Sequence, residues 1–385
     1  MKKFLVLLFI VNCADEATDP SALLGQLVLQ KNQFSVTGDA VLRNVSGIPT
    51  ILNRGKDGSI HLLTNAPEDV VNLTPRPPKN RMVLVVTSDF ESGTLDALIK
   101  GDSSASLISY TQQSLLGCNP YDAIRLDDSR IVITCYDTGT LRVLELSDNK
   151  VKETTSLANF DNDGVPQMDH MIQIKDRLYV SMAILDDGYI PKGTGIVAVL
   201  DAVTLELIDQ DDNDAGIQGI KLPCKNPVTS LAKMGDSFAI GCANDYGLSS
   251  DAGIAVVTPK NGKVELSWVA DVLEGVPLAL LTDHKNEETL YTLINVPDTA
   301  TGFPKEIRLV KIDKKNRIET LYSANGFNLS GLAQDEEGIL YVGNRTPTVK
   351  PTDTSDAGVW LVNPDTGKID GPALTTLPPY EIAAF

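Results

Sequence analysis

Residues 251–259, DAGIAVVTP, return 105 positions later as residues 356–364, DAGVWLVNP, and a Gly-Lys pair follows each copy. A weaker copy, GIVAVLD, occupies residues 195–201. Each copy is a short apolar run that ends in a turn built on Pro, Asp or Gly, which predicts a strand, a turn and another strand. Recurrence of this unit along the chain predicts a repeat protein made of β-sheets.

A second repeat pairs residues 118–135 with residues 224–242. Each copy opens with a cysteine shortly before an Asn-Pro pair, contains two apolar runs around a polar turn, and ends in a cysteine. This pattern is typical of a β-hairpin, in which facing residues lie about 4.5–5.5 Å apart and within disulfide range. A metal or redox role for these cysteines is the alternative, but the sequence contains no Cys-x-x-Cys. We predict two disulfides, Cys118–Cys135 and Cys224–Cys242.

The spacing of candidate blade starts decides the fold class. These starts are Pro49, Pro120, Pro166, Pro227, Pro277, Leu329 and Pro379. Most successive gaps are close to fifty residues with about four short strands each, which is typical of a propeller blade. We predict an all-β, seven-bladed β-propeller that occupies residues 26–385.

The two ends of the chain are expected to complete one blade together. The last start leaves only residues 380–384, enough for a single strand. Residues 27–45 precede the first start and contain strand-like runs that can supply the missing strands. A blade shared in this way closes the ring and removes sheet edges that would otherwise invite aggregation.

The N-terminus has the features of an export signal. Residues 1–12 carry two lysines and an apolar run that is too short to span about 30 Å of hydrocarbon. The segment Ile10-Val11-Asn12-Cys13 resembles the lipobox of bacterial lipoproteins, although Asn12 stands where a small residue is usual. That resemblance implies an acylated Cys13 and a cell-envelope protein tethered to a lipid bilayer on its periplasmic or surface side, with residues 13–25 as a linker.

Cysteine counting agrees with lipidation. The chain has five cysteines, and a lipid on Cys13 leaves four for two disulfides, which are typical of exported proteins. An ordinary secretory signal, cleaved near Ala14 or Ala17, is the alternative. Nucleic acid is not an expected partner, because the net charge is −18 and no run of Lys and Arg occurs.

The turn that follows the strongest repeat carries a family resemblance. Residues 362–369, VNPDTGKI, resemble the strand-turn units of YVTN-type and lactonase-like seven-bladed propellers. The resemblance covers nearly all of the mature chain and implies the blade architecture. Such families include surface and periplasmic binding proteins as well as some hydrolases, and no catalytic set of residues can be carried over.

Two acidic segments provide the candidate metal ligands. Asp161 and Asp163 precede the blade start at Pro166, and Asp211 and Asp214 lie ahead of the start at Pro227. Both segments are expected on loops that join an outer strand to the next inner strand, at one mouth of the ring. Carboxylate and amide oxygens suit calcium, the candidate cofactor, whereas solvated turns are the alternative explanation.

Asp169 and His170 are the polar candidates for the channel. They follow each other within an expected inner strand, where alternation sends neighbours to opposite faces, so that one could act there as a base or ligand. A structural hydrogen-bonding role is the alternative. The chain has three histidines, spread over different blades, and it contains no Gly-x-Ser-x-Gly, phosphate-loop or paired-histidine zinc motif.

These features predict an exported, membrane-anchored scaffold that uses one mouth of the ring to bind a protein, a peptide or a small ligand. A lactonase-like hydrolase with a divalent cation at the channel mouth is the alternative, and a purely structural envelope protein is a third. The ligand, the occurrence of catalysis, the membrane leaflet and the oligomeric state are not specified by the sequence.

Overall fold

The computed structural model describes the following residues in full: 118–148, 150–211, 213–244, 252–259, 266–267, 275–298, 305–326, 329–344, 357–373 and 382. For strands outside these ranges it describes the backbone pairing. The described residues are almost entirely strand and turn, with a single short 3-10 turn at Ala158–Phe160. None of the helical structure described has the length and apolar character needed to cross a membrane. The predicted signal segment, Cys13 and the linker lie outside the described residues.

The chain divides into two compact units. The smaller comprises Met1–Ala66, Gly101–Ala105 and Asn328–Phe385, and the larger comprises Pro67–Lys100 and Ser106–Phe327. Each unit is built from antiparallel sheets with four strands, except for one sheet with three described strands. The all-β prediction is therefore confirmed.

In the smaller unit, the two ends of the chain share a sheet. Its strand order is β27-β1-β2-β3, with β27 at Pro379–Ala384, β1 at Val36–Asn44, β2 at Pro49–Gly55 and β3 at Ile60–Thr64. Strand β27 pairs with β1 in antiparallel register, with Ala40 opposite Ala384 and Leu42 opposite Ile382. The predicted pairing between the C-terminal strand and residues 27–45 is confirmed.

The second sheet of this unit contains one copy of the strongest sequence repeat, residues 356–364. Its strands are β23 (Leu329–Gln334), β24 (Leu340–Asn344), β25 (Gly358–Val362) and β26 (Ile369–Leu374). Its first strand packs against β27, the first strand of the neighbouring sheet. First strands that pack on one another are what a propeller repeat requires.

The predicted blade start at Pro49 is wrong. Pro49 begins β2, the third strand in the order of the shared sheet, and the next sheet begins instead with β4 at Met82–Ser88, followed by β5 (Gly93–Lys100) and β6 (Ala105–Tyr110). Proline lacks an N–H and is tolerated at the first residue of a strand, so it marks a start without showing which strand starts.

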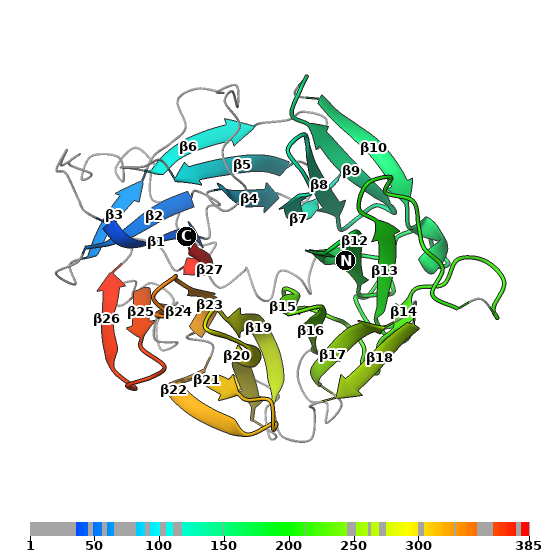
Figure 1. The fold of residues 1–385 in the computed structure, drawn as a ribbon. Helices are drawn as coiled ribbons and strands as arrows, with labels where there is room; N and C mark the ends of the chain where they lie inside the picture. Colours follow the sequence, from blue (N-terminus) through cyan, green and yellow to red (C-terminus); the bar gives the residue numbers. More distant parts are fainter. Residues whose placement is uncertain are drawn as a thin grey trace. The chain divides into compact units, whose positions relative to one another are not determined.

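The larger unit continues with four complete sheets (Figure 1). Their strands are β7 (Pro120–Arg125), β8 (Arg130–Cys135), β9 (Thr140–Glu145), β10 (Lys150–Ser156); β11 (Met168–Ile174), β12 (Arg177–Met182), β13 (Ile196–Asp201), β14 (Ile220–Lys221); β15 (Ala232–Met234), β16 (Ser237–Cys242), β17 (Gly253–Lys260), β18 (Lys263–Trp268); β19 (Val276–Asp283), β20 (Asn286–Pro297), β21 (Pro304–Ile312), β22 (Ile318–Asn325). Within this unit each first strand packs against the next one: β4 on β7, β7 on β11, β11 on β15 and β15 on β19.

Antiparallel order gives each of these sheets two distinct ends. At one end lie the turns that join the first to the second strand and the third to the fourth, such as residues 126–129 and 202–205. We call this the turn end. At the other lie the connections between the second and third strands and between successive sheets, such as residues 136–139, 157–167 and 183–195. We call this the loop end. The loop at residues 183–195 is one such connection between a second and a third strand.

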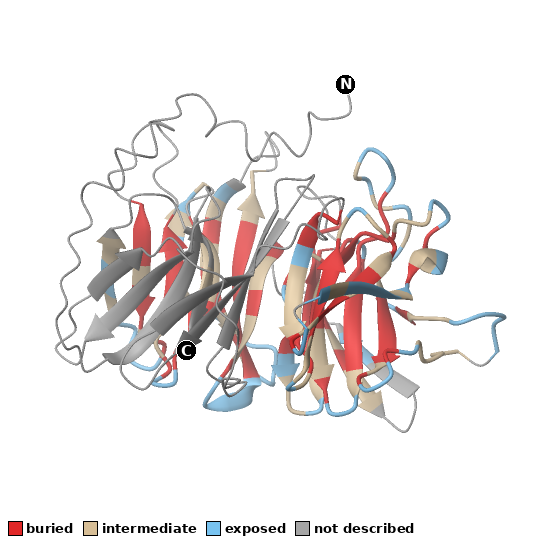
Figure 2. Cartoon of the chain, turned by 90° about the horizontal axis from the view of Figure 1, so that it is seen from above, coloured by how far each residue is buried: buried red, intermediate tan, exposed pale blue. Residues whose placement is uncertain are grey.

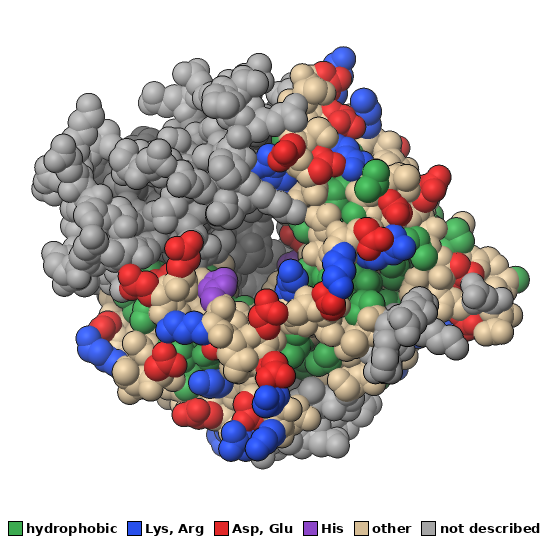
Figure 3. All heavy atoms as spheres, viewed as in Figure 1, with side chains coloured by type: hydrophobic (Ala, Val, Ile, Leu, Met, Phe, Trp, Pro, Cys, Tyr) green, Lys and Arg blue, Asp and Glu red, His purple; other side chains and the backbone are tan. Residues whose placement is uncertain are grey.

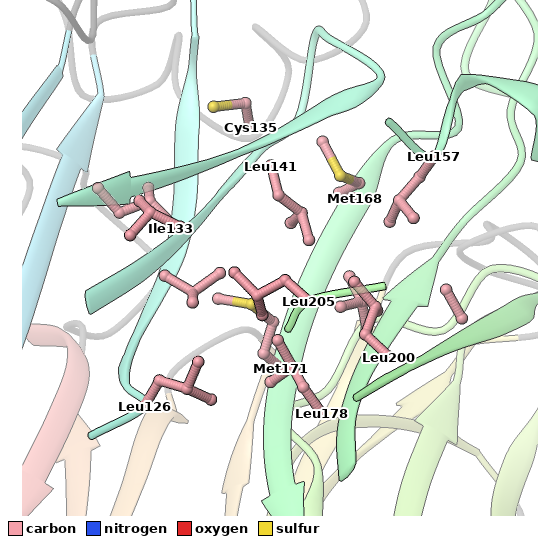
Figure 4. Packing of buried hydrophobic residues seen from close by; sticks show 14 of the residues in the cluster. Leu126, Ile133, Cys135, Leu141, Leu157, Met168, Met171, Leu178, Leu200 and Leu205 are labelled. Atoms are coloured by element: carbon pink, nitrogen blue, oxygen red, sulfur yellow. The ribbon is translucent and has the colours of Figure 1, made fainter. Parts of the chain in front are cut away.

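The core fills the space between successive sheets. Between sheets β7–β10 and β11–β14, Leu141, Met168, Leu178 and Leu200 are fully buried and point toward one another (Figure 4). Each such side chain contributes about 1.5–3 kcal/mol on burial. Second strands such as β8 are buried on both faces, whereas the outer strand β10 is mostly exposed (Figure 2).

Both predicted disulfides are present at the loop end. Cys118 and Cys135 have Cα atoms 4.8 Å apart, and those of Cys224 and Cys242 are 5.9 Å apart. Each joins the segment that leads into a first strand to the last residue of the second strand. The sequence identified these partners because the turn of each hairpin lies about halfway between its two cysteines, which brings both to the same end of the hairpin.

At the turn end, side chains of the repeat serve the backbone. Asp201 Oδ1 accepts hydrogen bonds from the N–H groups of Val203 and Thr204, and Asn363 Oδ1 accepts them from Asp365 and Thr366. The repeated turn motif therefore explains architecture and carries no chemistry of its own.

Candidate functional site

Two adjacent first strands carry the same irregularity at their loop ends. In β7, Pro120 lies opposite Cys135 while Ala123 lies opposite Ile133, so Tyr121 and Asp122 together face one residue of β8. This is a β-bulge, which interrupts alternation and re-aims side chains.

The same bulge recurs in β11. Met168 lies opposite Met182 and Met171 opposite Val180, so Asp169 and His170 together face Ser181. A bulge at the same level of two neighbouring sheets gathers four side chains that regular strands would send to alternate faces.

Hydroxyl groups of the second strands hold both bulges. Thr134 Oγ1 accepts a hydrogen bond from Asp122 N at 2.9 Å and donates one to the carbonyl oxygen of Asp169 at 2.8 Å. Ser181 Oγ accepts from His170 N at 3.1 Å. The carboxylate of Asp122 also accepts from Met171 N at 2.7 Å, which links the two sheets. The bulges are therefore tied to each other as well as to their own sheets.

His170 lies between two carboxylates. Its Nδ1 is 3.7 Å from Asp122 Oδ2, and its Nε2 is 3.3 Å from Asp169 Oδ1. The Asp169 side chain is 3% exposed and that of His170 is 21% exposed. Alternation predicted opposite faces for Asp169 and His170, and this is wrong because the bulge brings both groups together.

Aromatic rings complete this cluster. The Tyr121 ring stacks on Tyr136 with centroids 5.3 Å apart and meets the ring of His170 edge-on, also at 5.3 Å. Tyr121 is 41% exposed, and among the first strands whose side chains are described it is the one large hydrophobic residue that is exposed. Burial, and then the charge of Asp137, raise the pKa of Tyr189.

The predicted metal ligands Asp161 and Asp163 already hold a cation of the chain itself. Lys192 Nζ lies 2.6 Å from Asp161 Oδ2 and 2.9 Å from Asp163 Oδ2. Burial lowers the pKa of Lys192, but its interactions with the two carboxylates outweigh that effect and raise it. The hydrogen bond from Lys192 lowers the pKa of Asp163. This ion cluster ties the loop at residues 183–195 to the loop at residues 157–167.

Asp211 and Asp214 lie elsewhere. Residues 209–219 project from the middle of the outer strand, because Leu207 bridges to Leu200 before the projection and Lys221 pairs with Ile196 after it (Figure 1). Asp211 caps this loop by accepting hydrogen bonds from Asn213, which lower its pKa. The expectation that this segment joins an outer strand to the next sheet is wrong, and the two acidic pairs do not meet.

No three or more His, Cys, Asp or Glu side chains group as a metal site within the part of the chain that the structure describes. The calcium hypothesis therefore has no support from the described residues. The four loop-end segments 118–122, 136–140, 157–170 and 183–195 nevertheless contain seven acidic residues against one lysine, with a single histidine. On the face shown in Figure 3, the described acidic and basic side chains are mixed.

Sequence reasoning missed Tyr121, Asp122, Tyr136 and Lys192. A signal for the first two existed, since Tyr121-Asp122 and Asp169-His170 both follow the first residue of a first strand. A hydroxyl residue also stands one place before the end of each partner strand. Lys192 had no such signal, because its partners are some thirty residues away in another loop.

The sequence shows no match to a family model or to a curated protein. Solved structures resemble it over most of its length. A provisionally assigned 6-phosphogluconolactonase from Bacteroides fragilis superposes with a TM-score of 0.58 at 12% identity, covering 90% of this chain and 98% of that one. Its counterpart from Bacteroides uniformis has a TM-score of 0.55 at 11% identity, covering 90% and 99%.

AztD from Citrobacter koseri in its apo form is also similar, with a TM-score of 0.50 at 13% identity, covering 90% of this chain and 98% of that one. The fold is propeller-like. Sequence identities this low establish the propeller-like fold alone, because unrelated activities share such folds.

Proposed function

We propose that the protein is an exported, membrane-anchored, seven-bladed β-propeller that binds its ligand at the loop end of sheets β7–β10 and β11–β14. The observation that carries this proposal is the exposed Tyr121 ring, which lies on Tyr136 and His170 at two coupled bulges. Bulges occur preferentially beside functional sites, and exposed aromatic rings are enriched where proteins bind partners.

Export is supported by the two disulfides, which persist in oxidising compartments. The basic and apolar N-terminus and the lipobox-like segment before Cys13 support anchoring through a lipid. Intact-mass analysis of protein made in a bacterial host tests both: diacylglycerol plus acyl mass on Cys13, and a gain of four hydrogens on reduction. An unmodified Cys13 would remove the anchor from the proposal.

Binding is favoured over the lactonase-like alternative by Lys192. That alternative needs the acidic loops to hold a divalent cation, but the carboxylates of Asp161 and Asp163 converge on the Lys192 ammonium. Asp211 and Asp214, the other proposed ligands, lie on a projection of the outer strand. The chain therefore neutralises its best acidic pair internally.

Hydroxyl-radical footprinting tests the location of the binding face. The protein is labelled in cell envelopes of the organism that produces it and, separately, after purification. We expect oxidation of Tyr121 and of Ile190, which is 61% exposed at the loop end, to fall severalfold in the envelope. Val203, 70% exposed at the turn end, is the matched control and should be oxidised equally in both samples. Equal oxidation of Tyr121 in both samples would refute binding at this face.

A further inference from the structure

We infer that Tyr121 and Tyr136 form a site of oxidative modification, at which a peroxidase and hydrogen peroxide join the two rings in a dityrosine cross-link. This inference goes beyond ligand binding and does not depend on the proposed function. It rests on three observations: the contact between the two rings, the exposure of one of them, and the backbone contacts that keep them together.

The contact between the rings comes first. Their centroids are 5.3 Å apart and their planes are inclined by only 28°. Within the described residues, no other pair of tyrosine rings is in contact. Dityrosine forms when two tyrosyl radicals join through ring carbons beside their hydroxyl groups, so the coupled rings must already be neighbours. The stack is therefore the place in the described structure where such coupling is possible within one molecule.

The exposure of Tyr121 gives an oxidant access to the pair. Its side chain is 41% exposed and Tyr136 is half-buried, whereas Tyr179, Tyr291 and Tyr341 are buried. An exposed side chain can also rotate between torsional minima, which lets the Tyr121 ring close the remaining distance to Tyr136. Among the described tyrosines, Tyr121 thus combines access to solvent with a second tyrosine ring in contact.

The backbone holds the two rings together. The preceding residues, Pro120 and Cys135, lie opposite each other in the β7–β8 pairing. Tyr136 N donates a hydrogen bond to the Asn119 carbonyl oxygen at 2.9 Å, and the Cys118–Cys135 disulfide closes the same hairpin. Groups held in place react with each other much faster than with a second molecule. The disulfide also removes two thiols of this hairpin that would otherwise reduce a tyrosyl radical.

The reaction balances with hydrogen peroxide as the oxidant. Each ring loses one electron and its phenolic proton, which leaves two phenoxyl radicals. The radicals form one carbon–carbon bond, and the hydrogens on the bonded carbons move to the phenolic oxygens. The protein loses two hydrogens in total, and one hydrogen peroxide takes them up to become two water molecules. The two disulfides are typical of proteins in oxidising compartments, which is the setting that this chemistry needs.

Treatment of dilute, full-length, disulfide-bonded protein with a peroxidase and hydrogen peroxide tests the inference. We expect dityrosine fluorescence in the monomer and a loss of two hydrogens from its intact mass. After reduction, alkylation and digestion with trypsin, peptides 101–125 and 131–142 should remain linked. Because reduction opens the disulfide, that linkage can come only from the rings.

Phenylalanine variants keep the ring stack and remove the reactive hydroxyl. Tyr121→Phe and Tyr136→Phe should each lower the monomer's dityrosine fluorescence about tenfold or more. Tyr121→Phe leaves Tyr110 in the same tryptic peptide, so loss of the linked pair assigns the bond to Tyr121. Tyr322→Phe, at a half-buried tyrosine of β22, is the matched control and should leave the fluorescence unchanged. Absence of the linked peptides, linkage through other tyrosines, or dityrosine found only in cross-linked dimers would overturn the inference.

Discussion

The two ends of the sheets in the larger unit follow different rules. At the turn end, short turns are capped by their own side chains, as Asp127 shows by accepting hydrogen bonds from Ser129 and Arg130. One ion pair at this end, between Lys314 and Glu288, has side chains that are 62% and 61% exposed. At the loop end, the first strands are bulged, both disulfides are found, and the Asp161 carboxylate in the ion pair with Lys192 is only 3% exposed.

This difference shows that the two ends of the sheets are stabilised by different kinds of contact. The turn end is stabilised within each turn and by contacts between turns, such as the hydrogen bonds from Arg130 to the carbonyl oxygens of Ala202 and Val203. The loop end is stabilised by contacts between sheets and between loops, including the bond from Thr134 to Asp169 O. Because the loop end also contains both disulfides and a nearly buried ion-paired carboxylate, substitutions should have larger effects there.

The largest effect is expected from the disulfides. Replacing both Cys118 and Cys135 by Ser removes a cross-link that closes a loop with a sequence separation of 17. The free energy of unfolding should fall by about 3 kcal/mol, because the unfolded chain regains the entropy of the open loop. Thermal and denaturant unfolding followed by circular dichroism measure this change. An unchanged stability, in the absence of reductant, would show that the bridge does not constrain the unfolded chain.

The second-largest effect on stability is expected from close packing between two loops. A side chain on Gly139 would lie 2.8 Å from Ala158 Cβ and even closer to the carbonyl oxygen of Gly164. Gly139→Ala should therefore cost about 2 kcal/mol through overpacking of the loops at residues 136–139 and 157–167. Gly193→Ala is the matched control at the same end, since no atom lies within 4 Å of its added carbon. Equal denaturation midpoints for the two variants would contradict the packing argument.

The ion cluster should matter more than its turn-end counterpart. Lys192→Met removes the cation from the nearly buried Asp161 carboxylate and should lower the free energy of unfolding by about 1–2 kcal/mol, between the values for exposed and buried pairs. Lys314→Met breaks a pair in which both groups are exposed and should lower the free energy of unfolding by less than Lys192→Met does. Urea unfolding of both variants at one pH makes the comparison, and a larger loss for Lys314→Met would reverse it.

The smallest effect concerns acid stability at the turn end. Burial opposes ionisation of Asp127, but hydrogen bonds from Ser129 and Arg130 outweigh it and lower its pKa from 3.8 to about 2. Because the folded pKa is depressed, this stabilisation is complete above pH 3.8 and is lost as the pH falls toward 2. Asp127→Asn should cost about 1 kcal/mol at neutral pH, and the difference from the wild type should shrink between pH 4 and pH 2. A difference independent of pH in that range would mean that the carboxylate charge is not responsible.

Local sequence patterns predicted much of the fold. The apolar runs and turns predicted an all-β chain, the hairpin spacing predicted both disulfides, and the short remainder after Pro379 predicted the pairing of β27 with residues 27–45. The disulfide prediction depends on neighbours within one hairpin, and the β27 prediction depends on a single strand that needs a sheet to pair with. The start at Pro49 failed because a proline shows where a strand begins but gives no information about its position in the sheet.

The candidate site was only partly predictable. Asp169 and His170 were recognised as polar residues of a first strand, but their shared direction depends on a bulge that alternation does not anticipate. Asp161 and Asp163 were recognised as an acidic pair, but Lys192, which lies between them, comes from a different loop. The predicted location of Asp211 and Asp214 was wrong because the outer strand resumes at Ile220 after the projection.

By itself, the sequence determined the β-rich repeat, the cysteine pairs and the strongly negative charge, because each depends on residue types and on spacing along one or two adjacent strands. Only the tertiary structure decided which side chains meet at the loop end. The bulges at Tyr121-Asp122 and Asp169-His170 are held by hydroxyl groups of neighbouring strands, and the Lys192 cluster joins two loops. Such contacts form only after sheets have packed side by side, when distance along the chain no longer measures distance in space.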